Sequence, residues 1–190
     1  MTKHPIIAAI ALLALTSNAS AQWYQGPSGG SGGSPFDSWE ESGHATDISS
    51  VGVIDDGTIR CISIGYRGTP ANPGRWTAFW HGTCLYGAGE IGFEHSCSML
   101  LDADEYLLGV EGTYEDHISS LRFYTSKRTT QSCKTNPQHP NVWGTRGSRS
   151  FGYTAPSGQM IVALIGRAGE SVDAIGVMYA PCPPATKQCK

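Results

Sequence analysis

The stretch "QMIVALIGRAGESVDAIGVMYA", residues 159–180, decides how this 190-residue chain is organised. Two apolar runs flank a short loop, which is the pattern of two antiparallel strands joined by a turn. Because side chains alternate across a strand, Asp173, Ile175, Val177 and Tyr179 share one face of the second run. A carboxylate therefore leads an otherwise apolar face, just where the loop ends.

The same unit occurs twice more along the chain. Residues 106–124, "YLLGVEGTYEDHISSLRFY", align with this hairpin and place Ser119 on Asp173. A shorter copy, "SVGVIDDGTIRCISIGY" at 50–66, places Arg60 at the same position. We therefore predict three hairpins, each with a loop of about six residues. They would form three small sheets around a pseudo-threefold axis.

Short β-rich runs alternate with Gly, Asp, Asn and Pro turns, and helical periodicity is nearly absent. This pattern predicts an all-β domain. The inward faces of the three sheets would supply the core by burying apolar area. Their predicted members are Ile62, Ile64, Tyr66, Leu121, Phe123, Ile175, Val177 and Tyr179.

The first residues have the pattern of an export signal. In "MTKHPIIAAIALLALTSNASA", Lys3 precedes an apolar run, and small residues end the segment. Residues 1–21 are therefore predicted to be a secretory signal peptide, with an apolar part too short for a membrane anchor. We expect one soluble, secreted, extracellular domain over 22–190, with no membrane insertion. Its last ten residues, 181–190, form a cysteine-containing tail.

The charge balance excludes one class of partner. The chain has 13 basic and 16 acidic residues and a net charge of −3, with no basic stripe. Nucleic acid is therefore not an expected partner.

Six cysteines in an exported chain predict three disulfides, although fifteen pairings are possible. Proximity along the chain favours Cys84–Cys97 and Cys182–Cys189, which leaves Cys61–Cys133. The alternative is a zinc site, because His81 and Cys84 in "HGTC" and His95 and Cys97 in "HSC" are spaced like metal ligands. An oxidising compartment favours disulfides, so we expect no metal.

The segment "GPSGGSGGSPFDSW", residues 26–39, has two interpretations. By composition it is a flexible linker. A linker normally separates domains, however, and only four residues would precede this one in the mature chain. The alternative is a tight segment whose glycines permit positive φ and close approach of a ligand to bare N–H groups.

Three motifs in this order carry a family resemblance: the glycine-rich start at 26–37, the middle at 104–129 and "GRAGESVDAIGVMY" at 166–179. Together they resemble the jacalin-related lectins. The resemblance implies a β-prism I fold, with three four-stranded Greek-key sheets in pseudo-threefold symmetry. It also implies non-covalent sugar binding without metal, cofactor or catalysis.

The family site, carried over, combines a G-x-x-x-D loop with a glycine of the N-terminal segment. The implied residues are Gly33, Gly169, Glu170, Ser171 and Asp173. An ionised aspartate only accepts hydrogen bonds, so Asp173 would take two sugar hydroxyls, and backbone N–H groups would donate back. We expect Asp173 at a surface loop.

The resemblance also bears on valency and specificity. Arg60 and Ser119 replace the acid in the other two copies, which predicts one site per chain. "GTYED" at 112–116 also matches G-x-x-x-D, and we interpret it as turn chemistry. Uncut family members tend to prefer mannose or glucose over galactose, so glycans or glycoproteins of that type are the expected partners. Weak single sites favour a homo-oligomer.

Other classes remain open. A glycosidase would need two carboxylates at a defined separation, and the candidates are Glu90, Glu94, Asp102, Asp104 and Glu105. Residues 100–109, "LLDADEYLLG", look instead like a polar turn between strands. A secreted structural or coat protein could use the same fold without a working site. Trp76, Phe79, Trp80 and Tyr86 could stack on a sugar, although core packing is the simpler interpretation.

Overall fold

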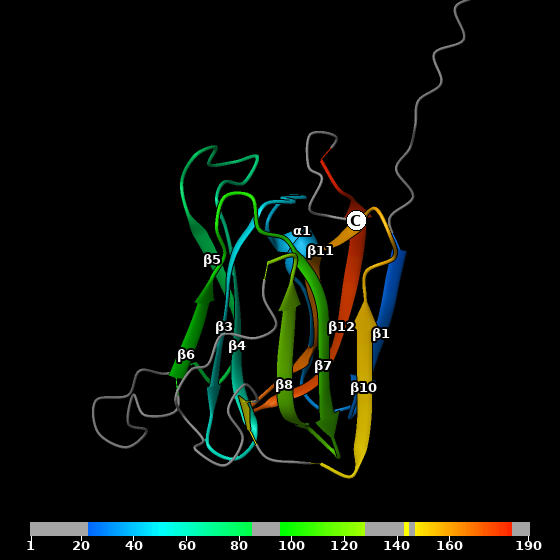
Figure 1. Ribbon diagram of the computed structural model, residues 1–190. Coiled ribbons are helices and arrows are strands. Elements are labelled where there is room, and N and C mark those ends of the chain that lie inside the picture. Colours follow the sequence, from blue (N-terminus) through cyan, green and yellow to red (C-terminus); the bar gives the residue numbers. More distant parts are fainter. Residues whose placement is uncertain (1–22, 85–95, 128–142, 145–146, 184–190) are drawn as a thin grey trace, which may run out of the picture.

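The computed structural model describes residues 23–84, 96–127, 143–144 and 147–183, which build three four-stranded antiparallel sheets (Figure 1). The predicted signal peptide and Gln22 lie outside these ranges. The elements are β1 Trp23–Gly29, β2 Ser34–Asp37, α1 Ser38–Glu41, β3 Ile48–Asp55, β4 Ile59–Tyr66, β5 Thr77–Gly82, β6 Ser96–Leu100, β7 Leu107–Tyr114, β8 Ile118–Thr125, β9 Trp143–Gly144, β10 Arg149–Thr154, β11 Gln159–Ala168 and β12 Val172–Pro181. The predicted all-β fold is confirmed.

The strand orders are β1-β12-β11-β2, β10-β7-β8-β9 and β5-β4-β3-β6. The middle pair of each sheet is one of the three predicted hairpins. The turns of these hairpins are shorter than expected, because the strands extend further than predicted. Only three residues remain in each turn, namely 56–58, 115–117 and 169–171. The turns of β3–β4 and β7–β8 lie at the lower end in Figure 1.

Each hairpin carries a β-bulge at the same place. Ala168 pairs with Val172 and Arg167 with Ala174, so Asp173 is the extra residue of its strand. By the same register shift, Ser119 is the extra residue of β8 and Arg60 that of β4. The sequence alignment of Asp173, Ser119 and Arg60 is therefore confirmed by the backbone register. Bulges re-aim a side chain, and here they do so at equivalent points of three sheets.

A glycine on the neighbouring strand accompanies each bulge. Gly29, Gly82 and Gly144 all have positive φ, and a Cβ on each would lie 2.0–2.2 Å from the carbonyl oxygen of the bulge residue. Any side chain would collide with that oxygen, so only glycine fits. The pseudo-threefold symmetry thus extends from the hairpins to the strands beside them.

The core lies between the three sheets, as predicted. All eight expected inward residues are buried in one apolar cluster, to which each sheet contributes. Side chains that alternate inward along β4, β8 and β12 meet there, and removing their apolar area from water stabilises the packing of the three sheets.

The glycine-rich segment 26–39 is not a linker. It includes the end of β1, the whole of β2 and the start of α1. Strands β1 and β2 belong to one sheet, and α1 follows β2 directly. The short helix α1 begins after Asp37, whose carboxylate accepts the Trp39 N–H at 2.9 Å as an N-cap. The segment is therefore part of the folded domain.

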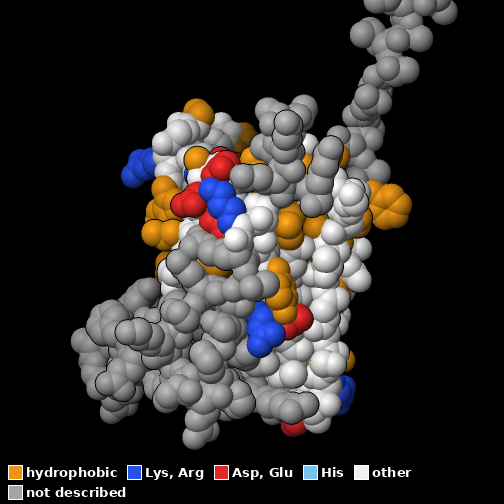
Figure 2. Space-filling model, viewed as in Figure 1, with side chains coloured by type: hydrophobic (Ala, Val, Ile, Leu, Met, Phe, Trp, Pro, Cys, Tyr) orange, Lys and Arg blue, Asp and Glu red, His pale blue; other side chains and the backbone are white. Residues whose placement is uncertain are grey.

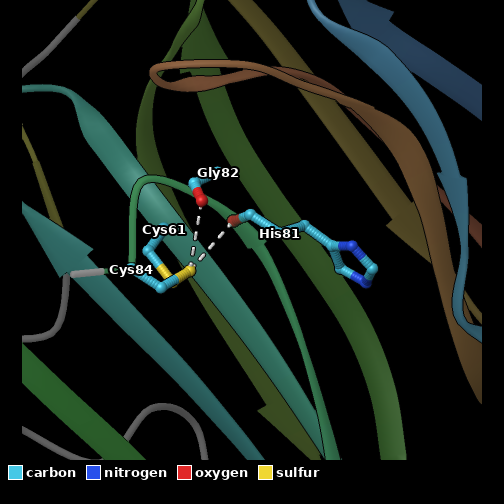
Figure 3. Close-up of a disulfide and its surroundings, with 4 residues drawn as sticks. All are labelled: Cys61, His81, Gly82 and Cys84. Carbon is cyan, nitrogen blue, oxygen red and sulfur yellow. Dashed lines mark hydrogen bonds between the residues drawn. A yellow bond between two sulfur atoms is a disulfide. The ribbon is translucent and has the colours of Figure 1, made fainter.

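The structure corrects the disulfide prediction. Cys61 is bonded to Cys84, so the expected Cys84–Cys97 and Cys61–Cys133 pairs are wrong (Figure 3). The cause is strand pairing: β5 returns along β4, Cys61 faces Gly82, and the chain beyond β5 brings Cys84 back beside Cys61. Sequence proximity could not predict this, because the return strand intervenes.

The other cysteines are only partly covered by the structure. Cys182 is in a disulfide, but Cys133 and Cys189 lie outside the described residues, as does the side chain of Cys97. The Cys182–Cys189 pair therefore stays a prediction.

Acidic and basic side chains are mixed on the surface. On the face in Figure 2, the central Lys and Arg side chains lie next to Asp and Glu side chains. Two such pairs are Arg122 with Glu111 and Lys127 with Asp102, at 3.0 and 3.2 Å. Within the described ranges, no helix has the length and apolar character needed to cross a membrane.

Candidate functional site

The fold brings Gly33, Gly169 and Asp173 together at the end of the β11–β12 hairpin. A Cβ on Gly33 would lie 2.5 Å from Asp173 Oδ2, and one on Gly169 would lie 3.7 Å from the same atom. Gly32 is equally close to the other carboxylate oxygen, with its ideal Cβ 2.4 Å from Oδ1. The predicted partners, which are more than 130 residues apart in sequence, therefore enclose one carboxylate.

Asp173 is more buried than expected. Only 7% of the residue is exposed, which corrects the expectation of a surface loop. The bulge turns its side chain toward the glycines of 32–33 instead of into solvent. Among the described residues, its Oδ2 has no hydrogen-bond partner. A buried acceptor without a donor is costly, and such atoms are often completed by a ligand.

Gly169 adds no side-chain atom to the space beside this carboxylate. Its φ lies outside the left-handed region, so glycine is not required there by backbone conformation. A Cβ at this residue would stand 3.2 Å from Gly33 Cα and 3.8 Å from Gly33 N. A side chain at 169 would therefore cover both the Gly33 N–H and the Asp173 carboxylate.

Gly33 has a structural requirement of its own. Its φ is +58°, and a Cβ would lie 2.3 Å from the backbone carbon of Ala168. The glycine therefore permits the close approach of β2 to β11 as well as access to its N–H.

The turn between Gly169 and Asp173 is braced from another sheet. Ser171 is buried, and its Oγ accepts a hydrogen bond from Arg60 Nη1 at 3.0 Å. The turn closes on itself through the Gly169 N–H, which donates to the Ser171 carbonyl at 2.9 Å. Glu170 is exposed at the tip. The Ser171 side chain is thus engaged with Arg60, and Glu170 presents its side chain to solvent.

The β7–β8 turn supplies a residue that the sequence analysis missed. His117 Nδ1 lies 3.4 Å from Asp173 Oδ1, and about half of the His117 side chain is exposed. The backbone of Asp116 in the same turn packs against Gly30, whose ideal Cβ would lie 2.0 Å from the Asp116 carbonyl oxygen. The aspartate of the second G-x-x-x-D match therefore belongs to the β7–β8 turn, as predicted, and this turn borders the site.

A second missed residue is Arg167, the cation inside the quoted "GRAGES" stretch. Its guanidinium donates to three successive backbone carbonyls of the glycine segment. The distances are 3.1 Å to Ser31, 2.7 Å to Gly32 and 2.6 Å to Gly33. The residue's position directly before the loop was the only sequence signal for this role.

The remaining candidates are placed elsewhere. Phe79 packs against the core beside Tyr66, whereas Trp76 and Trp80 are 56% and 43% exposed, so core packing is wrong for the two tryptophans. Both lie on or next to β5, in a sheet other than that of Asp173. Tyr86 lies outside the described residues.

The carboxylates considered for an enzyme serve structural roles where they are described. Lys127 pairs with Asp102 and Asp104, and Glu105 accepts from the Asp102 N–H. These residues form the predicted polar turn between β6 and β7. Glu90 and Glu94 lie outside the described residues.

Of the four residues in the zinc alternative, the structure describes the side chains of His81 and Cys84, whereas His95 and the side chain of Cys97 lie outside the described residues. Cys84 is in the disulfide with Cys61, and the His81 ring points away from it, as Figure 3 shows. His81 instead stacks on Phe36 with ring centroids 4.0 Å apart. The dashed contacts from Cys84 Sγ to the His81 and Gly82 carbonyls are 3.5 Å long, and a disulfide sulfur has no proton to donate there.

Comparison with known proteins agrees with this geometry. The sequence model of the jacalin-like lectin domain matches residues 25–178. The chain belongs to the jacalin-like lectin family. Its membership agrees with the expectation of a non-enzymatic, carbohydrate-binding domain.

The individual relatives of this jacalin-like chain share less than two fifths of their aligned residues with it. Myrosinase-binding protein 2 of Arabidopsis thaliana is 38% identical over 80 residues, which is 42% of this chain and 11% of that protein. This chain therefore spans about a tenth of that relative's length. Wild-type Malaysian banana lectin has a TM-score of 0.64 at 26% identity, covering 85% of this chain and all of that one. A mannose-binding lectin from champedak has a TM-score of 0.60 at 26% identity, covering 85% and 99%.

Proposed function

We propose that this protein is a secreted lectin that binds one glycan per chain, non-covalently and without metal, at Asp173, Gly33 and the 169–171 turn. The observation that carries the proposal is the buried Oδ2 of Asp173, which has no hydrogen-bond partner in the described part of the chain and lies beside Gly33 and Gly169. A carboxylate oxygen accepts only, so the group that completes it must be a donor such as a hydroxyl.

A neutral polyol fits the mixture of donors and acceptors. Asp173 accepts two hydroxyl protons, and the N–H groups of Gly33, Glu170 and Ser171 donate to ring or hydroxyl oxygens. Gly169 gives the sugar ring room to approach. Since a hydrogen bond to a charged group contributes about 1.5–3 kcal/mol, a few such contacts account for weak monovalent binding.

We propose mannose- or glucose-type glycans as the ligand class. The champedak relative is named as mannose-binding, and the glycine segment lies inside this chain and not at a free amino terminus. Weak single sites would gain avidity from a homo-oligomer, which we propose as the working state. Residues 1–21 are proposed as the signal peptide of a secreted, extracellular protein whose single domain is 22–190.

A glycan array probed with the oxidised 22–190 protein tests this function. We expect selective signals from mannose- or glucose-terminated glycans, and calorimetry with the best monosaccharide should give one site per chain. Signals confined to galactose would contradict the ligand class. Glycan cleavage would favour an enzyme, and silence across the array would favour the structural-protein alternative.

A further inference from the structure

One arginine, Arg167, holds the glycine segment of the site, residues 31–33, through its backbone carbonyls. Arg167 donates from Nε to the carbonyls of Ser31 and Gly32 and from Nη2 to that of Gly33. Three successive carbonyls on one guanidinium are an unusual use of an exposed cation, since its ordinary partners are carboxylates.

The carbonyl directions determine the N–H directions. The peptide bonds after Ser31 and Gly32 are trans, and in a trans peptide the C=O and the next N–H point in opposite directions. Carbonyls turned toward Arg167 therefore turn the N–H groups of Gly32 and Gly33 away from it. Among the described residues, no backbone acceptor is paired with these two N–H groups.

Asp173 lies against the same two glycines. The ideal Cβ positions of Gly32 and Gly33 are within 2.5 Å of its carboxylate oxygens. Backbone donors and a carboxylate acceptor thus adjoin one another, and a sugar needs both at a fixed separation. Glycines without this anchor would sample many conformations, because glycine loses more freedom on ordering than any other residue.

We propose that Arg167 is the positioning residue of the binding site, which fixes the donor N–H groups of the glycine segment before any ligand arrives. The expected effect on sugar affinity rests on the proposed function, whereas the contacts of Arg167 with the glycine segment do not. The guanidinium also polarises the peptides whose N–H groups would meet the sugar, which strengthens them as donors. Affinity would otherwise be lost to ordering the segment at each binding event.

Two variants and two measurements test the inference. Arg167→Lys keeps the charge but offers a point ammonium, which cannot span three carbonyls, and Arg167→Met removes the donors. Arg122→Lys is the matched control, because Arg122 pairs with Glu111 in another sheet. Backbone ¹⁵N order parameters of the sugar-free protein report the rigidity of 31–33, and calorimetry with a monosaccharide reports the affinity.

We expect order parameters of about 0.85 at Gly32 and Gly33 in the wild type and values below about 0.6 in both Arg167 variants. Sugar affinity should fall at least about tenfold in both, with the thermal midpoint nearly unchanged and the control unaffected. Unchanged order parameters would overturn the inference, as would a flexible segment with wild-type affinity. If the wild type binds no sugar, the proposed function fails, and the order parameters alone decide whether Arg167 fixes the segment.

Discussion

Arg60 of β4 donates from Nη1 to Ser171 Oγ, 3.0 Å away in the turn that precedes Asp173. Arg60 occupies in its own sheet the bulge position that Asp173 occupies in the site-bearing sheet. The same guanidinium pairs with Asp56 through Nε at 2.7 Å. The arginine at the bulge position of one hairpin therefore braces the turn of the hairpin that carries the aspartate.

Replacing Arg60 by methionine should loosen that turn. The change removes the hydrogen bond to Ser171, worth about 1 kcal/mol, and leaves that buried hydroxyl without this donor. It also removes the partly exposed ion pair with Asp56. We expect glycan affinity to fall about three- to tenfold and the thermal midpoint to fall by a few degrees. Calorimetry and thermal melts check both values, with Arg122→Met as the control. Unchanged affinity would show that the brace does not matter for binding.

Gly169 allows a steric test of the site. A valine there would project toward Gly33 Cα and Asp173 Oδ2, from an ideal Cβ 3.2 and 3.7 Å away. Gly169→Val should therefore abolish measurable glycan binding while the fold is retained. Gly152→Val on β10 is the matched control, because its Cβ would meet only Glu111 Cβ at 3.8 Å. Gly33→Val is less informative, since it would also collide with the Ala168 backbone.

If Gly169→Val binds sugar like the wild type with a native circular dichroism spectrum, the ligand does not lie over Gly33. That outcome would move the site away from the 169–173 turn.

The sequence was sufficient to predict the hairpins and their equivalence because both depend on local patterns. Alternating apolar residues define the strands, and the alignment of the three copies makes Arg60, Ser119 and Asp173 equivalent. The bulges at these residues were not predicted and are seen only in the register of the strands. The Gly33–Asp173 pair followed only from the family resemblance. Its proximity depends on β2 pairing with β11, which no local pattern reveals.

Contacts that depend on how strands return beside one another, or on how the sheets pack, could not be predicted. The Cys61–Cys84 bond depends on how β5 returns along β4, and chain proximity favoured the wrong partners. The contact of Arg60 with Ser171 and that of His117 with Asp173 each join the bulge residue of one sheet to a turn residue of another. They exist because three hairpins end at the same end of the prism, and this is a property of the packed sheets.

The Cys61–Cys84 disulfide should stabilise the fold measurably. It closes a loop of 23 residues, for which the chain-entropy model gives about 3 kcal/mol. The double variant Cys61→Ala/Cys84→Ala should lose about 2–4 kcal/mol of unfolding free energy in urea. Peptide mapping of the unreduced wild type should recover the Cys61–Cys84 peptide. A Cys84–Cys97 peptide instead would contradict the pairing.

His81 should make stability depend on pH. Burial lowers its pKa from 6.5 to about 4, and no hydrogen bond partners its Nε2 among the described residues, although Glu41 Oε2 is 3.3 Å away. The unfolded imidazole therefore takes up a proton at a higher pH than the folded one. Stability is full above about pH 6.5 and is lost as the pH falls toward about 4.

Between about pH 7.5 and about pH 5 this difference amounts to about 2 kcal/mol of unfolding free energy. Urea unfolding of wild type and His81→Gln at both pH values measures it. The variant should lose less stability on acidification than the wild type, because glutamine does not take up a proton in this range. Equal slopes for His81→Gln and wild type would contradict a buried neutral imidazole.

The central claim is that Asp173 accepts the hydrogen bonds of a sugar. Asp173→Asn keeps the shape of the side chain but replaces one acceptor oxygen by a donor and removes the charge. Among the described residues, Asp173 Oδ2 is buried without a partner, and the contact of Oδ1 with His117 is long at 3.4 Å, so removing the charge should change the unfolding free energy little. Asp116→Asn is the matched control, from the second G-x-x-x-D stretch and with an exposed residue.

The most direct measurement is calorimetric titration of the wild type and these two asparagine variants with the monosaccharide that the glycan array selects. We predict one site per chain in the wild type and in Asp116→Asn. We predict an affinity at least about ten- to a hundredfold weaker in Asp173→Asn, which should melt close to the wild-type temperature. Wild-type affinity in a folded Asp173→Asn protein would contradict the account, because Asp173 would then only begin a strand.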